Sequence, residues 1–251
     1  MQADRPAALI NLLFSGGIIA RPYQPVDVAG LIEASGQPTL RVDIVERLMI
    51  QAPNARFDVG IALRVLDECL RDPGGVLNLT AIGHRLSLDP RTVDQYLDVL
   101  QRRRLLRFAP NLGKAAGPRT RSRAKAYPVG TGLAVESLRR LDPELLNRSD
   151  VANRLLESWV VDQVVDGGVA NYYWRTPKGD KQVDVVLAQP GGKVVGLQVR
   201  ANALVTPQDA PGLRALTAAR DLAAGYVVYL GAKTVRLNNR CWALPASALA
   251  A

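Results

Sequence analysis

The sequence predicts an α/β protein with an all-helical start, and three observations support this class. Apolar residues recur at helical spacing through most of the first hundred residues. A strongly basic stretch then separates two short apolar runs that are typical of strands. Beyond residue 150, a helical pattern, three strand patterns, a second helical pattern and two more strand patterns follow in that order. We expect a helical segment over 1–56, a helix-rich domain over 57–132, a connector over 133–150 and an α/β domain over 151–251.

The first segment carries three short helical patterns, Ala7 to Phe14, Val26 to Ala34 and Arg41 to Ile50. Gly16 and Gly17 separate the first two, because paired glycines interrupt a helix. No residue pattern in this segment indicates chemistry by itself.

The second region has the pattern of a winged helix-turn-helix. An apolar stripe from Ile61 to Cys69 predicts a first helix. A short helix capped by Thr80, a tight turn at Ser87 to Pro90 and a longer helix follow, which is the arrangement that places the last helix in a DNA major groove. Apolar runs at 105–108 and 126–129 predict two strands, and the basic loop between them completes a wing. The alternative is a helical bundle with an irregular insertion.

The longer helix has distinct inner and outer faces. By helical spacing, the inner face carries Val93, Tyr96, Leu97 and Leu100. The outer face carries Arg91, Thr92, Gln95 and two aspartates, Asp94 and Asp98. We therefore expect Arg91, Thr92 and Gln95 to face DNA bases.

A basic block follows this helix and suggests a phosphate-binding surface. No acidic residue occurs from Val99 to Val135, and nine basic residues occur there, a number equal to the net charge of +9. They are Arg102, Arg103, Arg104, Arg107, Lys114, Arg119, Arg121, Arg123 and Lys125. Such a concentration of charge is typical of contact with a nucleic-acid backbone, so we expect double-stranded DNA as the partner. From this block we assign to the DNA interface Arg102, Arg103, Arg119, Arg121, Arg123 and Lys125. A solvated basic loop is the alternative.

The last region has the order of a mixed α/β domain. We expect helices at Val151 to Val165 and about Asp209 to Ala223, and strands at Ala170 to Arg175, Gln182 to Ala188, Lys193 to Ala201, Tyr226 to Leu230 and Thr234 to Trp242. Strand alternation places Gln198 and Arg200 on one face, and it turns Asp184 away from Val183 and Val185.

Several segments together resemble a known family. They are LLFSGG, RVDIVERLMIQ, TVDQYLDVLQRRRLLRF, AKAYPVGTGL, LLESWVVDQV, YYWRTPKGDKQVDVVL and VVGLQVRAN. Their order is similar to the C-terminal region of prokaryotic AAA-type ATPases, a domain of unknown function with a winged helix and a restriction-endonuclease-like fold. The resemblance implies a winged helix-turn-helix followed by a restriction-endonuclease-like mixed α/β domain.

The resemblance also implies a metal-dependent site. In endonuclease-like members a helix glutamate, a strand aspartate and a glutamate-x-lysine pair gather around magnesium, which activates water. Carried over, Glu157 and Asp184 become candidate metal ligands, Gln198 stands in place of the third carboxylate, and Arg200 replaces the lysine. Replacing the third carboxylate with Gln198 weakens magnesium binding. The planar guanidinium of Arg200 also differs from the compact ammonium of a lysine in geometry and hydrogen bonding. We therefore expect a degenerate PD-(D/E)XK nuclease-like site with little or no cleavage.

Other residue patterns exclude several activities. The segment Gly113-Lys114 is followed by Ala115 and lacks the first glycine of a phosphate-binding loop, so no ATPase activity is expected. The family's nucleotide domain is missing here, which suggests a remnant or a fragment that works with a separate AAA-type ATPase. One histidine and two distant cysteines give no zinc or redox motif. Without a long apolar stretch or a leader, we expect a cytoplasmic location and no membrane partner.

Two other functions stay open at this point. The chain could be a metal-dependent DNA nuclease centred on Glu157, Asp184, Gln198 and Arg200. It could also be an adaptor that docks on a separate ATPase through its winged helix. Salt-sensitive binding of DNA would favour the leading hypothesis over the adaptor, and magnesium-dependent nicking would favour the nuclease over both.

Overall fold

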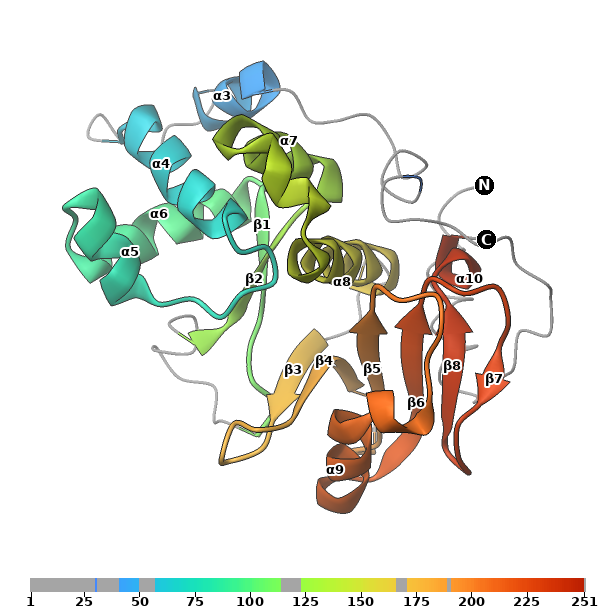
Figure 1. The fold of residues 1–251 in the computed structure, drawn as a ribbon. Helices are drawn as coiled ribbons and strands as arrows, with labels where there is room; N and C mark the ends of the chain where they lie inside the picture. Colours follow the sequence, from blue (N-terminus) through green and yellow to red (C-terminus); the bar gives the residue numbers. More distant parts are fainter. Residues whose placement is uncertain are drawn as a thin grey trace, which may run out of the picture. The chain divides into compact units, whose positions relative to one another are not determined.

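Helices come first and a sheet follows in the computed structural model, so the predicted mixed α/β class is confirmed (Figure 1). The structure describes residues 30, 41–49, 57–113, 123–165, 171–188 and 191–250. None of the described helices is long and apolar enough to span a bilayer. The first predicted helix, the second apart from Gly30, and the basic residues Lys114, Arg119 and Arg121 lie outside the described residues.

The described chain divides into two compact units. The helical unit holds the described residues among 36–110 and 114–158, and the sheet unit holds those among 111–113 and 159–250. The division falls inside helix α8 (Ser149–Val165), because its residues up to Ser158 belong to the helical unit and its residues from Trp159 belong to the sheet unit.

The helical unit consists of helices and a two-stranded hairpin. Before α8 it contains α3 (Arg41–Met49), α4 (Val59–Leu70), α5 (Leu79–Leu86), α6 (Pro90–Arg102), β1 (Leu106–Ala109), β2 (Lys125–Pro128), α7 (Thr131–Leu141) and the 3-10 helix η2 (Pro143–Asn147). The stripe predicted for α6 is buried, with Val93, Leu97 and Leu100 at 0 % exposure. Periodic apolar positions therefore define the inner face of this helix as expected.

The turn between α5 and α6 depends on local backbone chemistry. Asn78 caps α5 by accepting a bond from the backbone N–H of Ala81, whereas the sequence suggested Thr80 as the cap. Ser87 ends α5 in the left-handed conformation at φ 56°. A Cβ added to Gly83 would lie 2.5 Å from the carbonyl oxygen of Leu88, so only glycine lets the turn approach the helix this closely.

Helix α6 starts where the sequence places a helix start. The Asp89 side chain accepts a bond from the backbone N–H of Arg91, and Pro90 occupies the first turn, where its missing N–H costs nothing. Strands β1 and β2 then pair antiparallel, with Leu106 opposite Pro128 and Ala109 opposite Lys125. Two helices joined by a tight turn, α5 and α6, are thus followed directly by a hairpin in this unit.

A six-stranded mixed sheet forms the second unit (Figure 1). Its strands are β3 (Asn171–Arg175), β4 (Gln182–Ala188), β5 (Val194–Arg200), β6 (Leu222–Tyr229), β7 (Val235–Arg236) and β8 (Cys241–Pro245), in the spatial order β3-β4-β5-β6-β8-β7. Strands β5, β6 and β8 run parallel, and the other neighbours are antiparallel. The remaining elements are η3 (Pro207–Asp209), α9 (Pro211–Ala219) and α10 (Ser247–Ala250).

One predicted strand of this domain is wrong. The pattern from Thr234 to Trp242 predicts a single strand, but the structure divides it into β7 and β8, which pair with each other antiparallel. The polar segment Asn238-Asn239-Arg240 makes the turn between them, and the backbone N–H of Arg240 donates to Asn238 Oδ1.

Helix α9 connects β5 to β6 and packs against one face of the sheet (Figure 1). Leu213 and Leu216 join a buried cluster with Val183, Val186 and Val227. Gly212 lies so close to β4 that an added Cβ would be 1.9 Å from the carbonyl oxygen of Gln182. This close approach fixes the start of α9 over the strands that carry the candidate nuclease residues.

Candidate nucleic-acid interface

The outer face of α6 presents the residues that the sequence assigned to base contacts. Arg91 and Gln95 are exposed and one helical turn apart, and Thr92 beside them is half-buried. All three belong to the first two turns of the helix, which begins directly after the tight turn. In helix-turn-helix proteins this end of the second helix is the part that contacts base edges.

The far end of the same face is electrically balanced. Arg102 forms an ion pair with Asp98 one turn earlier, so a phosphate would have to compete with a carboxylate for this guanidinium. Asp89 adds a further carboxylate at the start of α6. The net positive charge on α6 is therefore small. A DNA-binding surface on this unit would need additional positive charge from the hairpin.

The hairpin contributes an exposed arginine and a buried lysine. Arg123 is exposed just before β2. Lys125 is 1 % exposed, and its Nζ lies 2.6 Å from Glu157 Oε1. Its ammonium therefore cannot reach a phosphate, and we remove Lys125 from the predicted interface. Strand alternation does not reveal this burial, because all four residues of β2 are buried.

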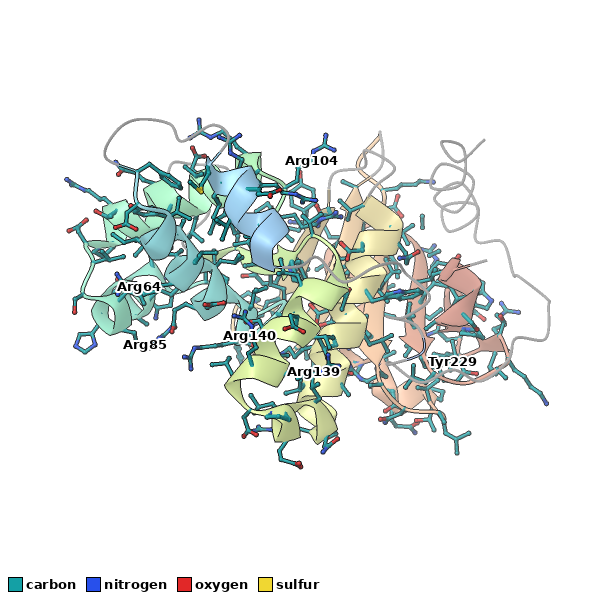
Figure 2. All side chains as sticks on the ribbon, turned by 90° about the horizontal axis from the view of Figure 1, so that it is seen from above. Arg64, Arg85, Arg104, Arg139, Arg140 and Tyr229 are labelled. Carbon is teal, nitrogen blue, oxygen red and sulfur yellow. The ribbon has the colours of Figure 1, made fainter. Side chains whose placement is uncertain are left out.

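Further arginines lie on the surface of the helical unit. Figure 2 labels Arg64, Arg85, Arg104, Arg139 and Arg140, all of which are exposed. Arg85 is paired with Glu68, and Arg140 lies near Asp67 and Glu136. These pairs neutralise part of the surface charge.

Arg103 and Arg104 close α6 in different ways. Arg103, which the sequence assigned to DNA, is half-buried as the C-cap of α6. Arg104 is exposed with φ 53°, a left-handed conformation that follows the C-cap and redirects the chain toward β1. Arg104 belongs to the basic block but not to the residues predicted to contact DNA, and its exposure makes it a further candidate for that surface.

Glu157, the first candidate nuclease residue, is held within the helical unit. Its Oε1 accepts bonds from Lys125 Nζ at 2.6 Å and from the Tyr127 hydroxyl at 2.7 Å. The residue is 3 % exposed, and an added Cβ on Gly74 would lie 3.2 Å from the same oxygen. A buried carboxylate that already faces an ammonium and a hydroxyl is poorly suited to binding magnesium.

The other three candidates belong to the sheet unit. Asp184 accepts bonds from Gln182 Nε2 and from the backbone N–H of Val199, both at 2.9 Å. Its Oδ2 also lies 3.8 Å from Arg200 Nη1, so the structure brings these two predicted neighbours together. Gln198 Oε1 accepts a bond from the backbone N–H of Leu213 at 3.1 Å, which anchors the start of α9 to β5.

These contacts do not fit a magnesium site. The carboxylate and amide oxygens accept hydrogen bonds from protein groups, and the guanidinium of Arg200 stands beside Asp184 where a cation would bind. Within the described chain, no group of three or more histidine, cysteine or acidic side chains could hold a metal ion. We therefore derive no metal-dependent step from them.

Neither cysteine is prepared for nucleophilic chemistry. Burial raises the pKa of the Cys69 thiol to about 12, and the neighbouring Glu68 carboxylate acts in the same direction. Burial also raises the pKa of Cys241. Both thiols stay protonated at neutral pH, as expected for structural cysteines.

Comparison with known proteins gives a family match only for the C-terminal part of the chain. Residues 152–249 match a family described as a domain of unknown function, DUF4143. This domain is common in the C-terminal region of AAA-type ATPase proteins. No curated protein and no solved structure matches the chain.

Proposed function

We propose that this protein binds double-stranded DNA through a winged helix-turn-helix formed by the helical unit. The observation that carries the proposal is the exposed pair Arg91 and Gln95 at the start of α6, directly after a turn so tight that it requires Gly83. The hairpin of β1 and β2 follows in the position of a wing.

Positive charge in the hairpin supports backbone contact. Between β1 and β2 the sequence carries Lys114, Arg119, Arg121 and Arg123 without an acidic residue. Because α6 itself is balanced by Asp94 and Asp98, the binding energy comes mainly from phosphates and the preference for one DNA sequence is weak.

A second proposal concerns the fold of the sheet unit. We infer a restriction-endonuclease-like fold, since Asp184 lies on β4 and Gln198 and Arg200 lie on the next strand. The protein contacts described above leave this site without cleavage activity. A separate AAA-type ATPase is a proposed partner, because the matched domain is common in such proteins and this sequence lacks a phosphate-binding loop.

The salt dependence of duplex binding tests the main proposal. If about five phosphates are neutralised, the logarithm of affinity falls against the logarithm of salt with a slope of about −4 to −5. The measurement is fluorescence anisotropy of a labelled duplex over a range of salt concentrations. A flat response would refute DNA binding through this surface.

A triple variant tests whether the hairpin supplies the charge. Replacing Arg119, Arg121 and Arg123 with alanine should reduce the slope by about 2 to 3 units. The matched control replaces three exposed arginines of the same unit, Arg139, Arg140 and Arg148, which have carboxylate neighbours. The control removes equal charge and should leave the slope close to that of the wild type. Equal effects of the two variants would contradict a specific role for the hairpin.

A further inference from the structure

An open groove of about 500 Å³ lies in the sheet unit. It is lined by α9 and the β7–β8 turn, through Arg214, Thr217, Asn238, Asn239 and Arg240. All five are exposed, two are arginines and none is acidic. Volumes of this size are usual for sites that bind small molecules.

Both arginines of the groove are held in place by backbone carbonyls. Arg214 Nη1 donates to Pro207 O at 3.1 Å, and Arg240 Nη1 donates to Leu222 O at 3.2 Å. Each contact uses one of the five N–H groups of a guanidinium. Tethered guanidiniums lose less side-chain entropy when they bind a ligand, so the groove is partly organised for an anion.

The neutral residues add a defined pattern of donors and acceptors. Asn238 Oδ1 accepts the backbone N–H of Arg240 at 2.9 Å, and the Asn238 side chain also hydrogen-bonds the Cys241 thiol, so Asn238 mainly shapes the turn that carries Arg240. The Thr217 hydroxyl donates to Leu213 O at 2.8 Å, so its oxygen can act only as an acceptor. Donors for an oxyanion therefore stand beside an acceptor for a hydroxyl group.

The Arg240 end of this groove lies far from Arg200, the last of the candidate nuclease residues, whereas its Arg214 end follows Leu213, whose backbone N–H Gln198 accepts. Arg240 contacts Leu222, the first residue of β6, and directly precedes β8, so this end of the groove lies where these parallel strands begin. Arg200 ends the parallel strand β5 and is level with Tyr229, the last residue of β6. At a rise of about 3.3 Å per residue, the two ends of β6 are roughly 23 Å apart.

We propose that the groove binds a phosphate ester of a sugar, with Arg214 and Arg240 on the phosphate and Thr217 accepting a bond from a sugar hydroxyl. Arginine forks match phosphate oxygens in geometry as well as in charge. Either a free sugar phosphate or the backbone of a nucleic-acid strand carries this chemistry. The inference does not depend on DNA binding by the helical unit.

Calorimetric titration of the full chain with ribose 5-phosphate tests the proposal, with ribose as the matched ligand that lacks phosphate. Ribose 5-phosphate should bind and ribose should not. Arg214→Gln and Arg240→Gln should each weaken binding by about tenfold or more, since each removes a charged hydrogen bond. Lys178→Gln, which removes an exposed charge from the β3–β4 turn, is the control and should bind like the wild type.

If the Arg240→Gln variant unfolds, the Arg214→Gln variant still tests the proposal. Arg214 is exposed on α9, so we expect its replacement to leave the fold intact. A second titration uses a short single-stranded oligonucleotide. Tighter binding of the oligonucleotide that is lost in Arg214→Gln would identify a nucleic-acid strand as the source, and tighter binding of ribose 5-phosphate would identify a free sugar phosphate. Absence of binding heat for both ligands at millimolar concentration, or equal loss in Lys178→Gln, would overturn the proposal.

Discussion

Removing one partner of the buried ion pair between Lys125 and Glu157 should strongly destabilise the helical unit. Their side chains are 1 % and 4 % exposed, and the Tyr127 hydroxyl donates to the same glutamate oxygen. Glu157→Gln leaves an ammonium buried without its counter-charge, and Lys125→Met leaves a buried carboxylate. Breaking a buried pair in this way costs about 3 to 5 kcal/mol.

The double variant Lys125→Met/Glu157→Gln should be much closer to the wild type than either single variant. It removes both charges, and glutamine keeps an acceptor for the Tyr127 hydroxyl, so no buried charge is left alone. At a urea m-value of about 2 to 3 kcal/mol/M, each single variant should lower the unfolding midpoint by about 1 to 2 M. Circular dichroism at the helical band measures this midpoint.

Asp98→Asn is the control, because it breaks the exposed pair of Asp98 and Arg102 on α6. A helical pair of this kind contributes about 0.3 to 0.5 kcal/mol, so the urea midpoint should change little. Additive losses in the double variant, or a loss in Glu157→Gln no larger than in Asp98→Asn, would refute the reasoning. Stabilisation of the wild type but not of Glu157→Gln by magnesium would restore Glu157 as a metal ligand.

Three further predictions follow from local contacts. Gly83→Ala should lower the melting temperature despite a gain in helix propensity of about 1 kcal/mol, because its Cβ would lie 2.5 Å from a carbonyl oxygen of the next turn; an unchanged or higher melting temperature would contradict the close approach. Cys69 and Cys241 should not react with a disulfide reagent at pH 8 until urea unfolds the chain, since burial raises both pKa values; rapid labelling of one thiol in the folded protein would show that it is accessible. Bonds from the backbone N–H and hydroxyl of Thr206 hold the pKa of Asp209 below its usual range, so this contact should stabilise the fold above pH of about 4 and lose its effect as pH falls through the lowered pKa; an Asp209→Asn variant with the same acid-unfolding curve as the wild type would count against it.

Local sequence predicted the helices α5 and α6 and the turn between them well, because the signals for these elements come from neighbouring residues. The inward stripe of α6 follows from helical periodicity, and Pro90 marks the start of that helix. The sequence predicts Thr80 as the N-cap of α5, but Asn78 is the N-cap in the structure. Either side chain can cap a helix, and only the backbone geometry selects one of them. The strand predicted from Thr234 to Trp242 failed for a related reason, because its apolar residues do not show where the chain reverses.

Composition and the order of residue patterns were sufficient to predict the α/β class, to locate the basic block and to show that a phosphate-binding loop is missing from this sequence. Each of these features depends on residue type and spacing alone. The tertiary structure decided which charges are available. Lys125 and Arg123 are two residues apart and look alike in the sequence, yet only Lys125 is buried against Glu157, 32 positions away. The groove likewise combines Arg214 of α9 with Arg240 of the β7–β8 turn, two residues that line one groove only in the folded sheet unit. Burial and distant pairing depend on how elements pack, and no local pattern encodes that packing.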